Sequence, residues 1–216
     1  MGLTKVRGGG VDTLVLADST NLNFGTSSDA KIFHDGNNTK FQHTGTGGLY
    51  VGADTFAITN GATDTNHISI DSNGHVTIPK QPAFLAFPSG DQDNIASGDT
   101  VAFATERFDQ NGDFSSNTFT APVTGRYQMS YCLRIDNVES DAIYTRTRLI
   151  TSNRTIQPTI IDLRNLSGDP AYWHFQVSIL TDMDANDTAY VQFNQSQGTT
   201  QADIQVTSFF SGYLAC

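Results

Sequence analysis

Short apolar islands separated by turn-forming residues run through almost the whole sequence, and no segment shows the spacing of an amphipathic helix. Between residues 11 and 79 the islands recur about every eight to ten positions. Asn, Asp, Ser, Thr and 19 Gly residues fill the gaps. These residues compete for backbone hydrogen bonds and favour turns over helices. The pattern therefore predicts an all-β protein.

A hairpin is predicted near the end of this first region. Ile68 and Ile70 alternate on one side of Asn73-Gly74, and Val76 and Ile78 alternate on the other. Asn-Gly favours the positive φ angles of a tight two-residue turn. Strands are expected at residues 14–16, 31–33, 40–41, 49–51, 55–58, 67–70 and 75–78.

The first region is too poor in apolar residues to form a normal core. Each island offers two or three apolar side chains, and a domain of this length buries only ~60% of its unfolded surface even with a full core. Equivalent strands from several chains could share one interior and cover one another's edges. Residues 1–80 are therefore predicted to form an attachment end and a β-rich fibrous, intertwined or prism-like shaft. A flexible Gly- and Thr-rich leader is the alternative.

From Gln81 onward the apolar islands lengthen, and the nearby prolines Pro79 and Pro82 mark a boundary. Tyr127, Met129, Tyr131, Leu133 and Ile135 alternate with polar residues, as in a strand with one buried face. The same alternation places Trp173 and Phe175 in the core. Strands are expected at residues 83–87, 100–104, 125–135, 144–150, 173–180, 188–193 and 204–214. Residues 81–216 are thus predicted to form an antiparallel sandwich or jelly roll.

The charge excludes several classes of partner. The chain carries 22 acidic and 12 basic residues, a net charge of −10. It therefore lacks the basic surface of a nucleic-acid-binding protein. No apolar run approaches the ~20 residues of a membrane helix, so no membrane insertion is expected. Two cysteines form neither a disulfide framework nor a zinc cluster; one bridge and two free thiols both remain open.

The second region resembles the globular head of the complement C1q family. The resemblance runs from Ala83 to Cys216 and centres on residues 108–114 and on Phe119, Gly125 and Tyr127. Residues 186–191 are similar to the family's turn into the next-to-last strand, and residues 208–214 are similar to its last strand. Met129 stands where Phe is usual. The resemblance implies the ten-stranded jelly roll that this family shares with tumour-necrosis-factor-like proteins.

The same resemblance raises the question of calcium. Some complement-like heads bind calcium near a trimer axis, and Asp162 and Asp169 stand where the acidic ligands would be. Three subunits would bring up to six carboxylates together, and a hard cation would relieve their repulsion. Solvated loop acids are the alternative. No other cofactor is expected.

Residues 29–38 and 43–51 are similar to repeats in tail-fibre proteins of marine bacteriophages. Shaft and head together predict a homotrimeric phage tail fibre or spike, made in the host cytoplasm and carried on the virion. Its N-terminus would contact other virion or tail proteins. No nucleophile elbow, phosphate loop or metalloprotease motif occurs, so no enzyme is expected. The alternatives are a purely structural trimerisation knob and a polysaccharide depolymerase.

The head is expected to recognise a host surface glycan or protein through loops at one end of the jelly roll. The longest polar connections are residues 136–141 and 162–172. Arg164 suits an anionic sugar or phosphate, and Tyr172 suits stacking on a sugar ring. The candidate receptor-binding residues are Asp136, Asn137, Glu139, Asp141, Arg164, Asn165 and Tyr172. The outward arginines Arg134, Arg146 and Arg148 suit either intersubunit ion pairs or a receptor-facing basic strip.

Overall fold

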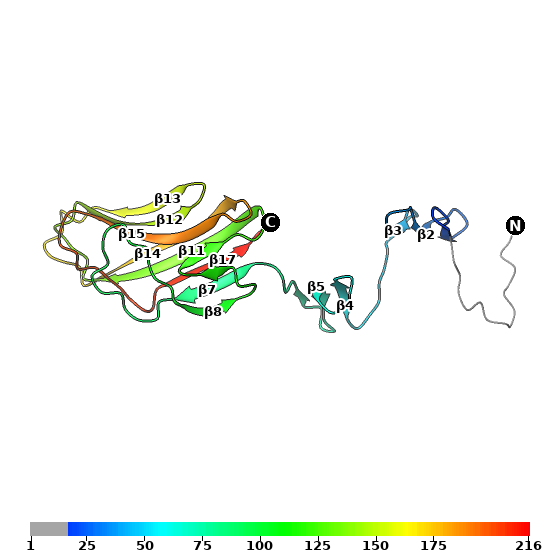
Figure 1. Cartoon of the computed structure of the whole chain (residues 1–216), viewed down its shortest axis with the longest axis horizontal. Helices are drawn as coiled ribbons and strands as arrows, with labels where there is room; N and C mark the ends of the chain where they lie inside the picture. The colour runs from blue at the N-terminus through cyan, green and yellow to red at the C-terminus, as the bar shows by residue number, and fades with distance from the viewer. Residues whose placement is uncertain (1–16) are drawn as a thin grey trace. The chain divides into compact units, whose positions relative to one another are not determined.

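The computed structural model describes residues 17–216, which form strands and turns without a helix (Figure 1). No helix in this part of the chain is therefore long and apolar enough to cross a membrane. The chain falls into two compact units, Met1–Asp54 and Thr55–Cys216. The strand expected at residues 14–16 and the extreme N-terminal attachment end lie outside the described residues.

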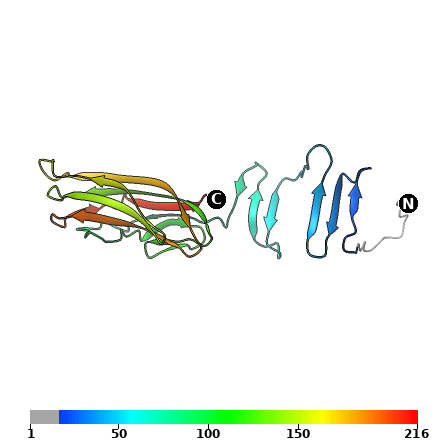
Figure 2. The ribbon, with the colours of Figure 1, turned by 90° about the horizontal axis from the view of Figure 1, so that it is seen from above.

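The first unit contains a small antiparallel sheet of β1 (Leu22–Phe24), β2 (Ala30–His34) and β3 (Thr39–His43). Figure 2 shows it in blue, viewed from above. Leu22 pairs with Ile32, and Ile32 pairs with Phe41, so these side chains share one face. No residue from 17 to 54 is buried, and Phe24 and Phe41 are about half exposed. The strand expected at residues 49–51 does not form.

The second unit begins with another three-stranded sheet, formed by β4 (Phe56–Thr59), β5 (Asn66–Ile70) and β6 (Val76–Thr77). The hairpin predicted at Asn73-Gly74 is confirmed, but its loop spans residues 71–75 and only Gly74 of the pair has a positive φ. The Asp71 carboxylate accepts hydrogen bonds from the amides of Asn73 (2.8 Å) and His75 (2.9 Å), and Gly74 has φ +84°. Phe56 pairs with Ile70, and Ile70 with Val76, which again creates an apolar face without a cover among the described residues.

The rest of the second unit is a sandwich of two antiparallel sheets (Figure 1). The sheet with the order β14-β11-β17-β7-β8 also carries β16 beside β11. Its strands are β7 (Ala83–Phe87), β8 (Thr105–Asp109), β11 (Gly125–Asp136), β14 (Tyr172–Met183), β16 (Asp203–Ile204) and β17 (Phe209–Leu214). The sheet with the order β13-β12-β15-β10-β9 contains β9 (Phe114–Ser115), β10 (Thr118–Thr120), β12 (Tyr144–Thr151), β13 (Thr155–Ile161) and β15 (Thr188–Ser196). The predicted antiparallel sandwich is confirmed, with its strands between Ala83 and Leu214.

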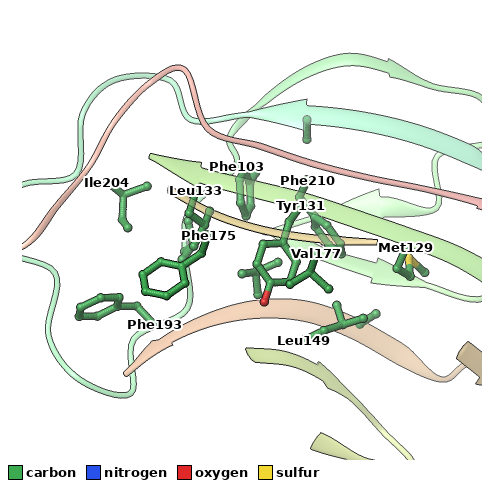
Figure 3. Packing of buried hydrophobic residues seen from close by; sticks show 14 of the residues in the cluster. Phe103, Met129, Tyr131, Leu133, Leu149, Phe175, Val177, Phe193, Ile204 and Phe210 are labelled. Carbon is green, nitrogen blue, oxygen red and sulfur yellow. The ribbon is translucent and has the colours of Figure 1, made fainter. Parts of the chain in front are cut away.

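The core lies between the two sheets, as the alternation in β11 predicts. Every second residue of β11 from Tyr127 to Ile135 is fully buried. Figure 3 shows Tyr131, Leu133 and Phe175 packed among side chains from both sheets. The Tyr131 hydroxyl lies 2.9 Å from the Thr147 hydroxyl of the opposite sheet, so this buried polar group has a partner.

Three expectations for the head are wrong in detail. Residues 100–104 form no ladder, because their backbone is held by single bonds such as Val101 N–H to the Val191 carbonyl (2.9 Å). The strand expected at 204–214 divides into β16 and β17 around a turn. Trp173 is 38% exposed instead of buried, because it lies near the start of edge strand β14 in an open groove beside β13.

Candidate loop-end site

The two long polar connections of the head meet at one end of the sandwich. The last residue of β11, Asp136, pairs with the first residue of β14, Tyr172. Beyond this pair, the Val138 amide donates to the Pro170 carbonyl (3.2 Å), and the Ser140 amide donates to the Asp169 carboxylate (2.8 Å). The chain's C-terminus lies at the other end of β11, where the Arg126 amide bonds to the Cys216 carbonyl. The sheet ladder thus joins the loops that carry the predicted site residues.

A polar pocket of about 530 Å³ opens between these loops and two further connections. Its lining comes from four separate segments, three loops and the segment that leads into β16: Asp93, Asn94, Asn137, Asp169, Pro170, Ala171, Gln201 and Asp203. Three carboxylates and three amides therefore face one space. Such groups offer both acceptors and donors for the hydroxyl groups of a ligand.

Asp203 holds two walls of this pocket together. Its carboxylate accepts a hydrogen bond from the backbone amide of Asn94 (2.8 Å) and another from the side-chain amide of Asn137 (2.6 Å). Asn94 and Asn137 both adopt positive φ angles of 55° and 54°, which asparagine tolerates better than most residues. The pocket is thus built from turn residues that a distant carboxylate fixes in place.

Asp169 organises the facing wall. Its carboxylate accepts hydrogen bonds from the Ser140 side chain and backbone and from the Gln201 side chain (3.0 Å). These bonds, those of the Ser140 hydroxyl first, lower the pKa of Asp169, so the group carries a negative charge at neutral pH.

The remaining predicted residues divide into three groups. Asp136 is held by Arg134 through two bonds of 3.0 Å, and the guanidinium lies 5.9 Å from the ring centre of Tyr172, which is 63% exposed. Asp141 and Asn165 are exposed on the same loops, outside the pocket lining. Arg164 is also exposed, but its guanidinium pairs with Asp162.

Glu139 requires a correction, because it is only 5% exposed. Its carboxylate accepts the amides of Asp141 (2.9 Å) and Thr199 (3.0 Å), which ties two loops together. Direct contact between Glu139 and a receptor conflicts with this burial, so its role in the structure is to hold the loops.

The two acids predicted to bind calcium at a trimer axis both have hydrogen-bond partners within one subunit, and the calcium site itself stays a prediction. Arg164 donates to Asp162 (2.9 Å from Nε) and lowers the pKa of Asp162 to about 2. The Asp169 carboxylate accepts hydrogen bonds from Ser140 and Gln201. In residues 17–216, no group of three or more His, Cys, Asp or Glu side chains is placed to hold a metal ion.

Sequence reasoning missed four of the pocket residues: Asp93, Asn94, Gln201 and Asp203. They lie in loops distant in sequence from both predicted connections, and their only signal is a high content of turn-forming residues. A second concave surface was also missed. It is a groove with exposed Trp173 (38%) and Ile160 (57%) between the edge strands β13 and β14.

The two antiparallel sheets first define residues 83–214 as a jelly-roll sandwich. Residues 83–215 match the sequence model of the C1q domain, and the chain belongs to the C1q domain family. This confirms the resemblance of the second region; the tail-fibre resemblance of the first region stays a prediction.

Solved structures similar to the chain include the globular domain of zebrafish complement 1qA protein, with a TM-score of 0.48 and 14% identity over 63% of this chain and 98% of that one. Another is murine APRIL at pH 8.5, with a TM-score of 0.46 and 10% identity over 62% and 99% of the two chains. No curated protein matches the sequence.

Proposed function

We propose that the chain is a non-enzymatic, homotrimeric fibre or spike of a bacterial virus, whose head binds a glycan or protein on the host cell surface. The loop-end pocket carries this proposal. Four segments of the chain converge on about 530 Å³ of polar space, and the exposed Tyr172 follows the lining residue Ala171 in the sequence. Carboxylates and amides suit sugar hydroxyls, and an exposed aromatic ring suits the apolar face of a sugar.

The outer face of the sheet containing β11 supports trimerisation. Phe108, Leu180 and Tyr213 point outward from β8, β14 and β17, and each is about half exposed. Smaller polar side chains such as Ser130 and Ser211 separate them. Exposed apolar side chains separated by small polar ones suit an interface between subunits, and homotrimers are the usual assembly of C1q-like domains.

Both small sheets of residues 17–80 support an oligomeric shaft for the same physical reason. The sheet of β1–β3 exposes Leu22, Phe24 and Phe41, and the sheet of β4–β6 exposes Phe56, Ile58 and Val76. Equivalent sheets from three chains would cover these faces together.

The proposed location is the virion, with synthesis in the host cytoplasm and attachment to other virion proteins through the N-terminus. Three linked heads would convert three weak contacts into strong overall binding. Domains of this family are generally binding or structural modules, which supports a role without catalysis.

The test combines mass measurement with glycan binding by the full chain. Sedimentation equilibrium should give three times the 23.4 kDa chain mass. On an array of bacterial lipopolysaccharides and capsular polysaccharides, Asp93→Ala with Gln201→Ala should abolish binding while the trimer persists. Asp184→Ala with Asn153→Ala removes one acid and one amide at the other end of the sandwich and should leave binding unchanged.

Two results would overturn the proposal. A monomer at micromolar concentration excludes the fibre. A trimer whose array binding and host adsorption are the same in both double variants is a structural knob instead.

A further inference from the structure

The outer face of the second sheet carries two adjacent arginines that the proposed loop-end site does not use. Thr145, Thr147 and Leu149 of β12 are fully buried, so the alternate residues Arg146 and Arg148 point away from the core. Arg146 lies opposite Asn194 of β15 and Ile160 of β13, and Arg148 lies opposite Gln192. Their backbones are about 7 Å apart along the strand.

Neither of these arginines pairs with a carboxylate, although carboxylates are abundant. Residues 81–216 contain 15 acidic residues and seven arginines. Arg134, Arg154 and Arg164 each form an ion pair with an aspartate. In the described chain, no Asp or Glu oxygen lies within 4.0 Å of Arg146 or Arg148. Two neighbouring positive charges are thus left without an internal counterion on an acidic protein.

Neutral groups hold both guanidinium groups in place. Arg148 donates to the side-chain oxygens of Gln157 (3.1 Å) and Gln192 (3.4 Å). The Arg146 guanidinium lies 4.7 Å from the ring centre of Tyr144. Such contacts fix the orientation of an arginine without cancelling its charge.

Two buried atoms at this place lack hydrogen-bond partners within residues 17–216: Arg146 Nε and Asn194 Oδ1. They belong to residues that face each other across the β12–β15 ladder. A buried polar atom without a partner is costly, so this unpaired donor and acceptor show that the face does not satisfy its own hydrogen-bonding groups.

We propose that this face, formed by Tyr144, Arg146, Arg148, Gln157, Gln192 and Asn194, is a binding site for an acidic sugar. The arginines bind the carboxylate or sulfate of the sugar, because a guanidinium matches an oxyanion with two parallel hydrogen bonds. The amides bind neighbouring hydroxyls. The net charge of −10 disfavours a continuous polyanion such as a nucleic acid, whereas one anionic group among hydroxyls fits two arginines. The site lies on another surface than the loop-end pocket and does not depend on the fibre function.

The test is calorimetric titration of the full chain with three oligosaccharides of equal length. One carries a single uronic acid, one carries a single sulfate group at the same position, and one is neutral. We expect binding of at least one acidic oligosaccharide, weakening with added salt, and none of the neutral one. The stronger of the two acidic ligands identifies the anionic group.

Two charge-matched double variants distinguish this site from the general charge of the protein. Arg146→Gln with Arg148→Gln should weaken binding at least about tenfold, since hydrogen bonds to charged groups are among the stronger ones. Arg107→Gln with Arg154→Gln removes the same charge elsewhere and should change it less than about twofold. Arg146→Lys with Arg148→Lys keeps the charge but removes the paired hydrogen bonds, so it should also weaken binding. It replaces the glutamine variant as the test if that variant does not fold.

Three results would overturn the proposed acidic-sugar site. They are an equal loss of binding in both glutamine variants, unchanged binding in the Arg146 and Arg148 variants, and binding of neither acidic oligosaccharide. Tighter binding of a single-stranded DNA of similar length would show a polyanion surface instead. Loop-end variants that lose host binding but keep acidic-sugar binding would separate this site from the proposed receptor pocket.

Discussion

Gly212 of β17 and Met129 of β11 lie side by side in the ladder, with no room for a larger residue at the glycine. A Cβ atom on Gly212 would lie 2.5 Å from the Met129 sulfur and 2.8 Å from a ring carbon of Phe84. The glycine is therefore required by close packing between two neighbouring strands and the core.

Gly212→Ala should lower the free energy of unfolding by about 1–3 kcal/mol, because overpacking forces neighbouring side chains to move. Urea denaturation followed by tryptophan fluorescence measures this change. Gly90→Ala is the matched control, since nothing lies within 4 Å of the new Cβ, and it should be close to neutral. A neutral Gly212→Ala would show that this packing is looser than described.

Glu139→Ala should destabilise the loop end by about 1–3 kcal/mol, because the amides of Asp141 and Thr199 lose their acceptor in a buried place. Hydrogen exchange of those amides should rise, while exchange in β11 stays slow. Asp141→Ala, an exposed change on the same loop, should leave both unchanged. Fast exchange throughout the head in Glu139→Ala would instead indicate global unfolding.

Phe108→Glu should dissociate the proposed trimer of heads, because it places a charge on the exposed apolar face of β8 and its neighbours. Sedimentation velocity measures the change in mass. Val206→Glu adds the same charge at another exposed apolar position and should keep the trimer. If both variants remain trimeric, the subunits associate through a different face or through the shaft alone.

The Asp162 carboxyl should titrate at about 2, because hydrogen bonds from Arg164 favour its charged form. The contribution of this pair to stability is present above the ordinary value of 3.8 and is lost as the pH falls towards 2. Carboxyl-carbon NMR follows the titration directly. Arg164→Gln should move the midpoint back towards 3.8, and an unshifted midpoint in the native chain would show that the pair is not formed.

Local residue pattern was enough to predict much of the head. The alternation from Tyr127 to Ile135 identifies β11 and its buried face, because one sheet face must exclude water while the other need not. Asn73-Gly74 likewise identifies the turn between β5 and β6 from backbone preference alone. The strands β9 and β10 were missed, since two or three residues carry too little periodicity. The longer strands β8 and β13 were also missed.

The sequence by itself determined that this chain is all-β, that its second part is a jelly roll, and that residues 136–141 and 162–172 are polar connections. Only the tertiary structure decided what these residues do. Four findings depend on which parts of the chain meet in space. They are the burial of Glu139, the pairing of Arg164 with Asp162, the exposure of Trp173, and the contribution of Asp203 to the pocket from a segment distant in sequence. Local pattern records which side of a strand faces the core, but contacts between distant loops are set by the order of strands in the two sheets.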